Sequence, residues 1–582
     1  MSDQTVGQPD STITAASRTA GYLSRLNSWR QSPKAAWAAV GVLWLIHLVY
    51  CWRNEGGLAN VVFTAAVTLT IALFIIILTR RPLFASVLSS CIVAAIIAGS
   101  TVKRQMMEMI VHAYDIVFYF SSWSTISYLW SDHRPYLLAL VGSVLLIVLL
   151  GVLAWKLDPL RVDRSAALAA AGAVAAIAFL SAQVKVERRH TQFYWDDLFV
   201  SSFYISWIET LETMWRGTLI EAAAEAKGPR FALPGTCNAS AKPPHILLIH
   251  QESVVPPSNF PQIRYDKSVD RMFQSYDGRL HKMRVETYGG ASWLSEFSIL
   301  AGVSTHSFGG MRQFVQSLMA GKLADTLPQT LQRCGYRNVV FYPMLRNFVS
   351  NAKFYTAIGM PEIFDMKDQG AKSVTERDRF YYTNALAEME RHFKARGQPL
   401  FVFLQTMATH SPYTFTYEPE VKVAGGPPGS NPEIHEYLRR LSMAHMDYDY
   451  MVGELKRRFP DEPFLIVHYG DHQPVATRTL LGYENEDPED MTLAPDSPGF
   501  LTYFAVSGLN YAPPPLPPVE VLDVPYLGGV ILEAARLPLS DSFKERRRLM
   551  AVCKGRYFTC PKKDEILQFH RRLIDSGLVE AR

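Results

Sequence analysis

Apolar residues dominate the first third of the chain, where they form five runs with no polar face. Each run is close to the roughly 20 residues that a helix needs to cross the hydrocarbon core of a bilayer. A bilayer accepts helices that are apolar on all sides, whereas a soluble core needs polar sequence to cover it. We therefore expect five membrane-spanning helices, at Ala35 to Trp52, Leu58 to Thr79, Leu83 to Ser100, Tyr136 to Trp155 and Ala166 to Ala182.

The charges of the short loops between these runs indicate an orientation. Cytoplasmic loops of membrane proteins carry an excess of Lys and Arg. Such residues precede the first run and follow the second and fourth runs, at Arg18, Arg25, Arg30, Lys34, Arg80, Arg81, Lys156, Arg161 and Arg164. The pattern predicts a cytoplasmic tail over residues 1–34, a five-span domain over residues 35–184, and an external location for everything that follows.

Two stretches rich in Trp, Tyr and Phe flank the last two runs, at residues 101–135 and 192–227. Trp and Tyr favour the headgroup region of a bilayer. We expect the first stretch to form an interfacial helix. The second belongs to a juxtamembrane linker over residues 185–240, and we expect it to lie on the membrane as a platform.

Residues 241–582 change to short apolar runs that alternate with helical patterns. This alternation predicts an α/β domain with a mostly parallel central sheet and helices on both faces. The expected strands are His245 to His250, Val339 to Phe341, Leu400 to Gln405, Phe464 to His468 and Leu501 to Val506. The expected helices are Leu323 to Cys334, Glu376 to Lys394 and Ile434 to Arg458.

Polar residues directly follow three of these strands, at the sheet edge where functional groups gather. Glu252 follows the first strand, His410 follows the third, and Asp471 and His472 follow the fourth. Taken singly, Glu252 also fits a surface or capping carboxylate, and His410 fits a turn residue. Together, carboxylates and imidazoles at one edge are ligands for a divalent cation, so the sequence predicts a metal site.

A further hydroxyl stands out in residues 286–297, Glu-Thr-Tyr-Gly-Gly-Ala-Ser-Trp-Leu-Ser-Glu-Phe, between an expected strand and an expected helix. The glycine pair places Ser292 at the start of that helix, where backbone N–H groups favour an anion. The same pattern also fits an ordinary helix cap. Thr287 and Ser295 are nearby, but Ser292 alone closely follows the glycine turn.

Four motifs in order carry a resemblance to a known family. Gln251-Glu252-Ser253, residues 287–297, His410 and Tyr469-Gly470-Asp471-His472 resemble the lipoteichoic acid synthase type, or phosphoglycerol transferase branch, of the sulfatase and alkaline-phosphatase-like superfamily. The likeness covers roughly residues 243–539, and the five-span anchor is similar as well.

The resemblance implies roles for these residues. Glu252, Asp471 and His472 would bind a divalent metal ion (Mn, Zn or Mg), and Ser292 would be both nucleophile and metal ligand. His410 would lie near the substrate phosphate and is our candidate general acid. His250 and His468, at strand ends beside these ligands, are interpreted as satisfied imidazoles behind the site.

The chain departs from the family pattern at two places. The family more usually has threonine at the nucleophile position, which is Ser292 here. An arginine commonly precedes the Tyr-x-x-x-Gly pattern that we match to Tyr355 and Gly359, and Asn351 stands in its place. Arg346 lies nearby and is the candidate for supplying the guanidinium, so both Arg346 and Asn351 are candidate substrate-binding residues.

By this resemblance the chain is a metal-dependent, membrane-anchored transferase. It would move a phosphoglycerol headgroup from phosphatidylglycerol, through a covalent Ser292 intermediate, to a cell-envelope glycan or polymer. A phosphoethanolamine transferase is the alternative. A sulfuric ester hydrolase is disfavoured because the Cys/Ser-x-Pro-x-Arg pattern is absent after Ser292. A catalytically inactive regulatory membrane protein also stays open, and transport is disfavoured because charges are nearly absent within the spans.

Charge and cysteine usage refine this picture. The net charge of +4 has no concentrated basic run behind it, which gives nucleic-acid binding no support. We expect a multi-pass protein of the bacterial cytoplasmic (inner) membrane with its catalytic domain on the external, periplasmic side. Cys237, Cys334, Cys553 and Cys560 fall in that compartment, which permits disulfides. Cys553 and Cys560 are close enough to pair, and the other pairings stay open.

Overall fold

The computed structural model describes residues 32–582 except residues 56, 108, 120–122, 187–197, 238–241, 347, 396, 422–430, 484–492 and 581–582. The chain divides into two compact units. A helical unit comprises the described parts of residues 1–113, 129–190 and 194–207. A sheet unit comprises the described parts of residues 114–128, 191–193 and 208–582.

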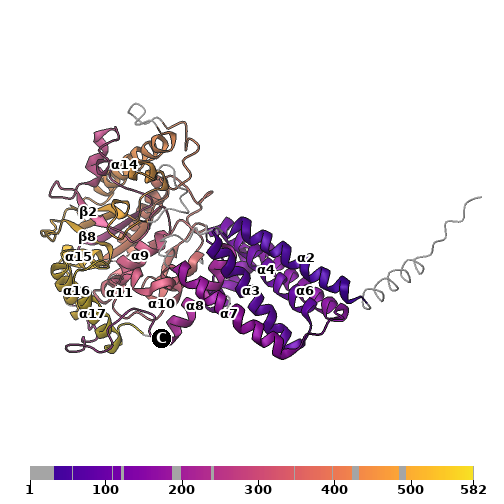
Figure 1. Cartoon of the computed structure of the whole chain (residues 1–582). Helices are drawn as coiled ribbons and strands as arrows, with labels where there is room; N and C mark the ends of the chain where they lie inside the picture. Colours follow the sequence, from indigo (N-terminus) through magenta and orange to yellow (C-terminus); the bar gives the residue numbers. More distant parts are fainter. Residues whose placement is uncertain are drawn as a thin grey trace, which may run out of the picture. The chain divides into compact units, whose positions relative to one another are not determined.

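The helical unit contains the five long apolar helices that the sequence predicts. They are α2 (Pro33–Asn54), α3 (Leu58–Thr79), α4 (Pro82–Met107), α6 (Arg134–Leu157) and α7 (Arg164–Val186). All five are long and apolar enough to cross a membrane (Figure 1). Within the unit α3 packs against α7, and α4 packs against α2, α3 and α6. Helix α3 has the predicted ends, whereas the other four extend a few residues past them, because polar residues such as Lys103 continue a helix that apolarity alone would stop.

The two aromatic stretches form shorter elements than expected. Residues 101–135 are divided among the end of α4, a π-helical turn η1 (Asp115–Tyr119), α5 (Trp123–Asp132) and the start of α6, with residues 108 and 120–122 outside the described part. The stretch 192–227 contains α8 (Phe199–Arg216), and residues 192–197 lie outside the described part. Their location at a membrane surface stays a prediction.

The sheet unit is built on one eight-stranded sheet with the order β4-β3-β5-β1-β6-β7-β2-β8. The first five strands in this order, β4, β3, β5, β1 and β6, are parallel to one another. Strand β7 runs antiparallel to both of its neighbours, β6 and β2. The prediction of a mostly parallel sheet is therefore confirmed. The strands are β1 (His245–Gln251), β2 (His281–Arg284), β3 (Arg337–Phe341), β4 (Glu362–Phe364), β5 (Leu400–Gln405), β6 (Phe464–Gly470), β7 (Leu501–Leu509) and β8 (Val521–Asp523).

Helices cover the sheet, as the alternating pattern predicts. They are α9 (Ser292–Ala301), α10 (Val315–Met319), α11 (Leu327–Arg333), α12 (Asn351–Ala357), α13 (Asp378–Ala395), α14 (Pro432–Arg458), α15 (Leu527–Ala534), α16 (Asp541–Val552) and α17 (Lys563–Asp575) (Figure 1). Short 3-10 segments are η2 (Pro257–Asn259), η3 (Lys267–Phe273), η4 (Thr305–Phe314), η5 (Phe348–Ser350), η6 (Val475–Leu481), η7 (Pro498–Phe500) and η8 (Val524–Tyr526).

Alternate residues of the central strands point to opposite sides of the sheet. Leu247 and Ile249 of β1 and Ile466 of β6 belong to one apolar core that also contains side chains of α13 and α14, such as Leu386 and Leu441. The residues of opposite parity in these strands, including His250 and Tyr469, therefore point to the other side. This alternation decides which strand-end residues can meet.

Two disulfides lie in the sheet unit, Cys237–Cys334 and Cys553–Cys560. The second is the short-range pairing suggested by spacing. The first joins residues 97 positions apart, which spacing could not indicate. Cys51 and Cys91 are free.

Candidate metal and nucleophile site

Ser292 is the first residue of α9, and an unusual backbone turn sets its position. Ala291 before it has a left-handed conformation with φ 61°, which residues other than glycine seldom adopt. The Ser292 hydroxyl donates to Glu252 Oε2 at 2.8 Å, and the residue at the cap position, Ala291, makes no side-chain cap hydrogen bond. The interpretation of Ser292 as an ordinary helix cap is therefore wrong.

The two neighbouring hydroxyls are engaged elsewhere. Thr287 Oγ1 donates to the carbonyl of Gly290 at 2.6 Å and so closes the glycine turn. Ser295 Oγ donates to the carbonyl of Asp471 at 2.6 Å and so ties α9 to the end of β6. Of the three hydroxyls, Ser292 is the one hydrogen-bonded to a candidate metal ligand side chain.

Strand pairing brings the polar residues after β1 and β6 together. The two strands run parallel and in register up to Gln251 and Gly470, so the next residues, Glu252 and Asp471, emerge side by side. His472 Nε2 lies 3.4 Å from Glu252 Oε1, 3.4 Å from Asp471 Oδ2 and 3.3 Å from Ser292 Oγ. The structure thus places the four predicted ligands in one cluster.

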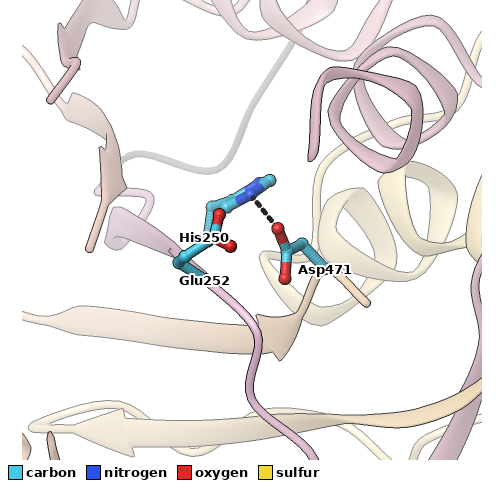
Figure 2. A group of neighbouring side chains, drawn as sticks. All are labelled: His250, Glu252 and Asp471. Atoms are coloured by element: carbon cyan, nitrogen blue, oxygen red, sulfur yellow. Dashed lines mark hydrogen bonds and ion pairs between the residues drawn. The ribbon is translucent and has the colours of Figure 1, made fainter. Parts of the chain in front are cut away.

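The two oxygens of Asp471 have different surroundings. Oδ1 accepts hydrogen bonds from the backbone N–H groups of Ser253 and His472, each at 2.7 Å. Oδ2 faces His472 and also His250, whose Nε2 lies 3.1 Å away (Figure 2). Ser253 reaches this position with φ 56°, a second non-glycine residue in the left-handed region beside the site.

The donor set fits a divalent metal ion. Ligand atoms each about 2.1 Å from one ion lie about 3 to 3.4 Å apart, which matches the His472 separations above. His250, Glu252 and Asp471 also offer ligand atoms that all lie within 4.8 Å of one another (Figure 2). Glu252, Asp471 and His472 are 5%, 0% and 1% exposed, so their charges are poorly screened by water.

The electrostatics of the cluster favour positive charge. Burial lowers the pKa of His472, but the Asp471 and Glu252 carboxylates outweigh burial and raise it to about 9. Burial raises the pKa of Glu252, but the charges of His472 and then His410 hold it well below its usual range. The negative potential that retains a proton on His472 would equally retain a cation.

His410 follows β5 on a loop that is fixed through its backbone. Asp378 accepts hydrogen bonds from the N–H groups of Met407 and Ala408, at 3.1 and 2.9 Å. Thr409 Oγ1 donates to the carbonyl of Glu252. The half-buried His410 side chain has a short contact, 2.5 Å, from Nδ1 to the Ser411 carbonyl, and its charge acts on the Glu252 carboxyl group.

Arg440 of α14, which the sequence analysis did not single out, holds the same loop. Its guanidinium donates to the carbonyls of His410 and Pro412 at 2.7 and 2.9 Å, and it pairs with Glu436 at 2.8 Å. An arginine that is 2% exposed needs such partners. The available signal was a Glu–Arg pair four residues apart among apolar positions, which is also common on helix surfaces.

The buried Glu296 side chain connects α9 to neighbouring elements of the sheet unit. Its carboxylate accepts hydrogen bonds from the side-chain amides of Gln316 and Gln405, at 2.6 and 2.7 Å. Burial raises its pKa to about 7. Because Gln405 ends β5, this contact links the helix of Ser292 to the strand that precedes His410.

In the described part of the chain, the two candidate substrate-binding residues, Arg346 and Asn351, are not hydrogen-bonded to the residues of the metal cluster. Arg346 pairs with Asp365 at 3.1 Å and with Asp368. Asn351 begins α12, is 1% exposed, and has an Oδ1 without a hydrogen-bond partner among the described residues. No hydrogen bond or ion pair within the described part of the chain joins either residue to Ser292, so their role stays a prediction.

Comparison with known proteins finds a family model that matches part of the chain. The Sulfatase family model matches residues 282–495, a range that includes Ser292, His410, Asp471 and His472 and begins after Glu252. An uncharacterized protein of Haemophilus influenzae is 25% identical over 322 residues, covering 53% of this chain and 54% of the relative. The lipoteichoic acid synthase of Staphylococcus saprophyticus is 23% identical over 193 residues, covering 32% of this chain and 29% of the relative. The chain thus spans about half or less of the length of these relatives.

Two solved structures are similar at lower identity. The phosphoglycerol transferase GacH of Streptococcus pyogenes, in complex with sn-glycerol-1-phosphate, matches at 14% identity with a TM-score of 0.46, covering 60% of this chain and 88% of GacH. The lipooligosaccharide phosphoethanolamine transferase EptA of Neisseria meningitidis matches at 13% identity with a TM-score of 0.43, covering 86% of this chain and 98% of EptA. The comparisons thus show that residues 282–495 match the Sulfatase family model.

Proposed function

We propose that the chain is a membrane-anchored transferase that moves a phosphoglycerol headgroup from phosphatidylglycerol to a glycan or polymer of the cell envelope. The observation that carries the proposal is the position of the Ser292 hydroxyl. It lies at the N-terminus of α9, 2.8 Å from Glu252 Oε2 and 3.3 Å from His472 Nε2. A hydroxyl in this setting suits attack on a phosphodiester, because the helix N-terminus and a bound cation both favour phosphoryl oxygens.

Glu252, Ser292, Asp471 and His472 would hold a divalent metal ion, Mn, Zn or Mg. When bound, such an ion lowers the pKa of the serine hydroxyl and neutralises phosphoryl charge. A histidine that is a ligand has no free lone pair for acid catalysis, so we assign proton transfer to the leaving oxygen to His410.

The transfer takes two steps. Ser292 Oγ forms a bond to phosphorus and gives its proton to the Glu252 carboxylate that accepts its hydrogen bond, while the bond from phosphorus to the diacylglycerol oxygen breaks and His410 protonates that oxygen. An acceptor hydroxyl then gives its proton to His410 and bonds to phosphorus. The bond from phosphorus to Ser292 breaks, and Glu252 returns the proton to Ser292.

The membrane-spanning helices would supply proximity to a lipid donor that stays at the bilayer surface. We place the protein in the bacterial cytoplasmic membrane with the sheet unit on the external side. Two features support this side: the positive loops predicted to be cytoplasmic, and the disulfides Cys237–Cys334 and Cys553–Cys560, which form in oxidising compartments.

A phosphoethanolamine transferase is the second candidate, because the same covalent route serves both headgroups. The observation that keeps it open is the arginine position of the family pattern, where this chain has Asn351 and where the nearby Arg346 is already paired with Asp365 and Asp368. Without a free guanidinium at this position, the site has less selectivity for one headgroup over the other.

The test uses the purified full-length protein in vesicles that contain either phosphatidylglycerol or phosphatidylethanolamine with a fluorescent acyl chain. We expect release of fluorescent diacylglycerol, and a mass increase of the Ser292 peptide that identifies the headgroup. Ser292→Ala should abolish both signals, whereas Thr287→Val, which removes only the hydrogen bond that closes the glycine turn, should weaken them without abolishing them. Diacylglycerol release by Ser292→Ala, or an adduct on another residue, would overturn the assignment of the nucleophile.

A further inference from the structure

Two buried histidines lie near the ends of the neighbouring strands β1 and β6 and look alike in sequence. His250 and His468 are each 1% exposed, and each has its Nδ1 close to a tyrosine hydroxyl, Tyr469 at 2.6 Å and Tyr503 at 2.9 Å. The register of β1 and β6 pairs His250 with Tyr469 and Ile249 with His468. Because alternate residues point to opposite faces, the two histidines occupy opposite sides of the sheet.

The two histidines differ in their remaining neighbours. His468 lies on the side of α14, with its ring 4.6 Å from that of Tyr448. His250 lies on the other side, with Nε2 3.1 Å from Asp471 Oδ2, as the dashed line in Figure 2 shows. Both histidines have aromatic neighbours, but His250 also contacts a candidate metal ligand, whereas His468 lies beside Tyr448 and Tyr503.

The hydrogen-bond partners of Tyr469 determine which atoms donate in the two His250 contacts. Tyr469 is fully buried, and His250 Nδ1 is the hydrogen-bond partner of its hydroxyl within the described part of the chain. A buried hydroxyl needs an acceptor for its proton, so Tyr469 donates to Nδ1. A neutral imidazole then carries its proton on Nε2, which donates to Asp471 Oδ2.

We propose that His250 is a positioning residue of the metal site, oriented by Tyr469 and holding the Asp471 carboxylate; this rests on the metal site of the proposed function. The amides of Ser253 and His472 fix Oδ1 of Asp471, and His250 fixes Oδ2. With both oxygens held, the carboxylate cannot rotate about its last bond. Outer partners of metal ligands typically contribute 10- to 100-fold to metal affinity.

The experiment measures Mn²⁺ binding by the full-length protein in detergent after removal of metal with a chelator, with free Mn²⁺ followed by electron paramagnetic resonance. His250→Leu should weaken binding by about 10- to 100-fold. His250→Gln should keep near-normal affinity, because its amide nitrogen can donate from the place of Nε2. Tyr469→Phe should fall between the two, because Nδ1 loses its donor.

His468→Leu is the matched control, since it removes an equally buried histidine next to a tyrosine on the other side of the sheet. It should leave the Mn²⁺ affinity unchanged even where it lowers thermal stability as much as His250→Leu does. Equal loss of affinity in both leucine variants would reduce His250 to a packing role and overturn the inference. So would unchanged affinity in His250→Leu.

Pulsed spectra of bound Mn²⁺ separate positioning from direct ligation. We expect one histidine nitrogen, that of His472, in the wild type and in His250→Gln alike. A second nitrogen that disappears in His250→Gln would make His250 a ligand and overturn its positioning role. A wild-type protein that binds no Mn²⁺ would overturn the metal site itself, and with it both the proposed function and this inference.

Discussion

The helical unit and the sheet unit differ in which side chains they expose and which they bury. In the helical unit large apolar side chains point outward, such as Leu145 of α6 and Leu180 of α7, each 65% exposed. In the sheet unit charged side chains lie inside, such as Glu252 and Asp471. The difference reflects the solvent each unit meets: lipid accepts apolar surface, whereas buried charge is tolerated only among partners.

The contrast also holds for packing. Gly142 of α6 has no atom within 4 Å of the place where a Cβ would stand. At Gly470 of β6 a Cβ would lie 1.8 Å from the carbonyl oxygen of Val254. Close approach of the backbone is therefore a requirement of the site in the sheet unit, and four experiments probe this contrast.

The largest expected effect is that of Gly470→Ala. The new methyl group would push away the loop after β1 that carries Glu252, because the obstructing atom is backbone and cannot rotate aside. We expect a loss of about 3 kcal/mol in the free energy of unfolding of the sheet unit, at the upper end for overpacking. Thermal unfolding measures it. Gly142→Ala should leave stability and membrane insertion intact, and equal losses in both variants would remove the contrast.

The second-largest effect is expected from Arg440→Met. It removes the donor to the His410 and Pro412 carbonyls and leaves Glu436 with less compensation, at a cost of about 3 kcal/mol. Hydrogen exchange over residues 407–417 should accelerate, and headgroup transfer should slow. Arg439→Met is the control, because Arg439 pairs with the same Glu436 but donates to the Val421 carbonyl rather than to His410 or Pro412. Faster exchange of that loop in the Arg439 variant would contradict a specific role for Arg440.

A smaller effect is expected from pH, through Glu296. Burial raises its pKa from 4.5 to about 7, so the folded protein holds a proton there that the unfolded chain releases. The contribution of this group to stability is complete below about pH 4.5 and is lost as the pH rises to about 7. Glu296→Gln should flatten the dependence of the unfolding temperature on pH between these values. An unchanged slope would mean that Glu296 is ionised in the folded protein.

The smallest effect concerns a buried carboxylate of the helical unit. Glu55 is fully buried and accepts hydrogen bonds from the N–H groups of Val200 and Ser201 at 3.0 Å each, so it caps the start of α8 from a distant part of the chain. Glu55→Gln should lower stability by about 1 kcal/mol, as measured by thermal unfolding in detergent, without loss of Mn²⁺ binding. Loss of Mn²⁺ would show that this carboxylate matters beyond the cap.

Much of the fold could be predicted from pattern alone. Five apolar runs gave the five long helices. Four of the five expected apolar strands became β1, β3, β5 and β6 of the parallel core, and the fifth became β7, which runs antiparallel to its neighbours. The strands β4 and β8 were missed because three residues are too few for any periodicity to be recognised. The aromatic stretch 101–135 was predicted as one helix because composition does not locate the breaks between η1, α5 and α6.

The candidate site could be predicted less completely. Glu252, Asp471 and His472 were selected because they follow apolar strands, and the structure places them in contact; their roles as ligands stay predictions. His250 was set aside together with His468, because both look alike in sequence. Strand register and side-chain alternation alone distinguish them, by directing His250 to Asp471 and His468 to Tyr448.

The sequence by itself determined where the membrane-spanning helices lie and which residue types end the strands, because apolarity and strand boundaries are local properties. The tertiary structure alone decided that Ser292 faces Glu252 rather than capping its own helix, that Arg440 holds the His410 loop, and that Cys237 pairs with Cys334. Those contacts join residues far apart in the chain. They depend on register, on the hand of a turn such as that at Ala291, and on which side of the sheet each residue occupies.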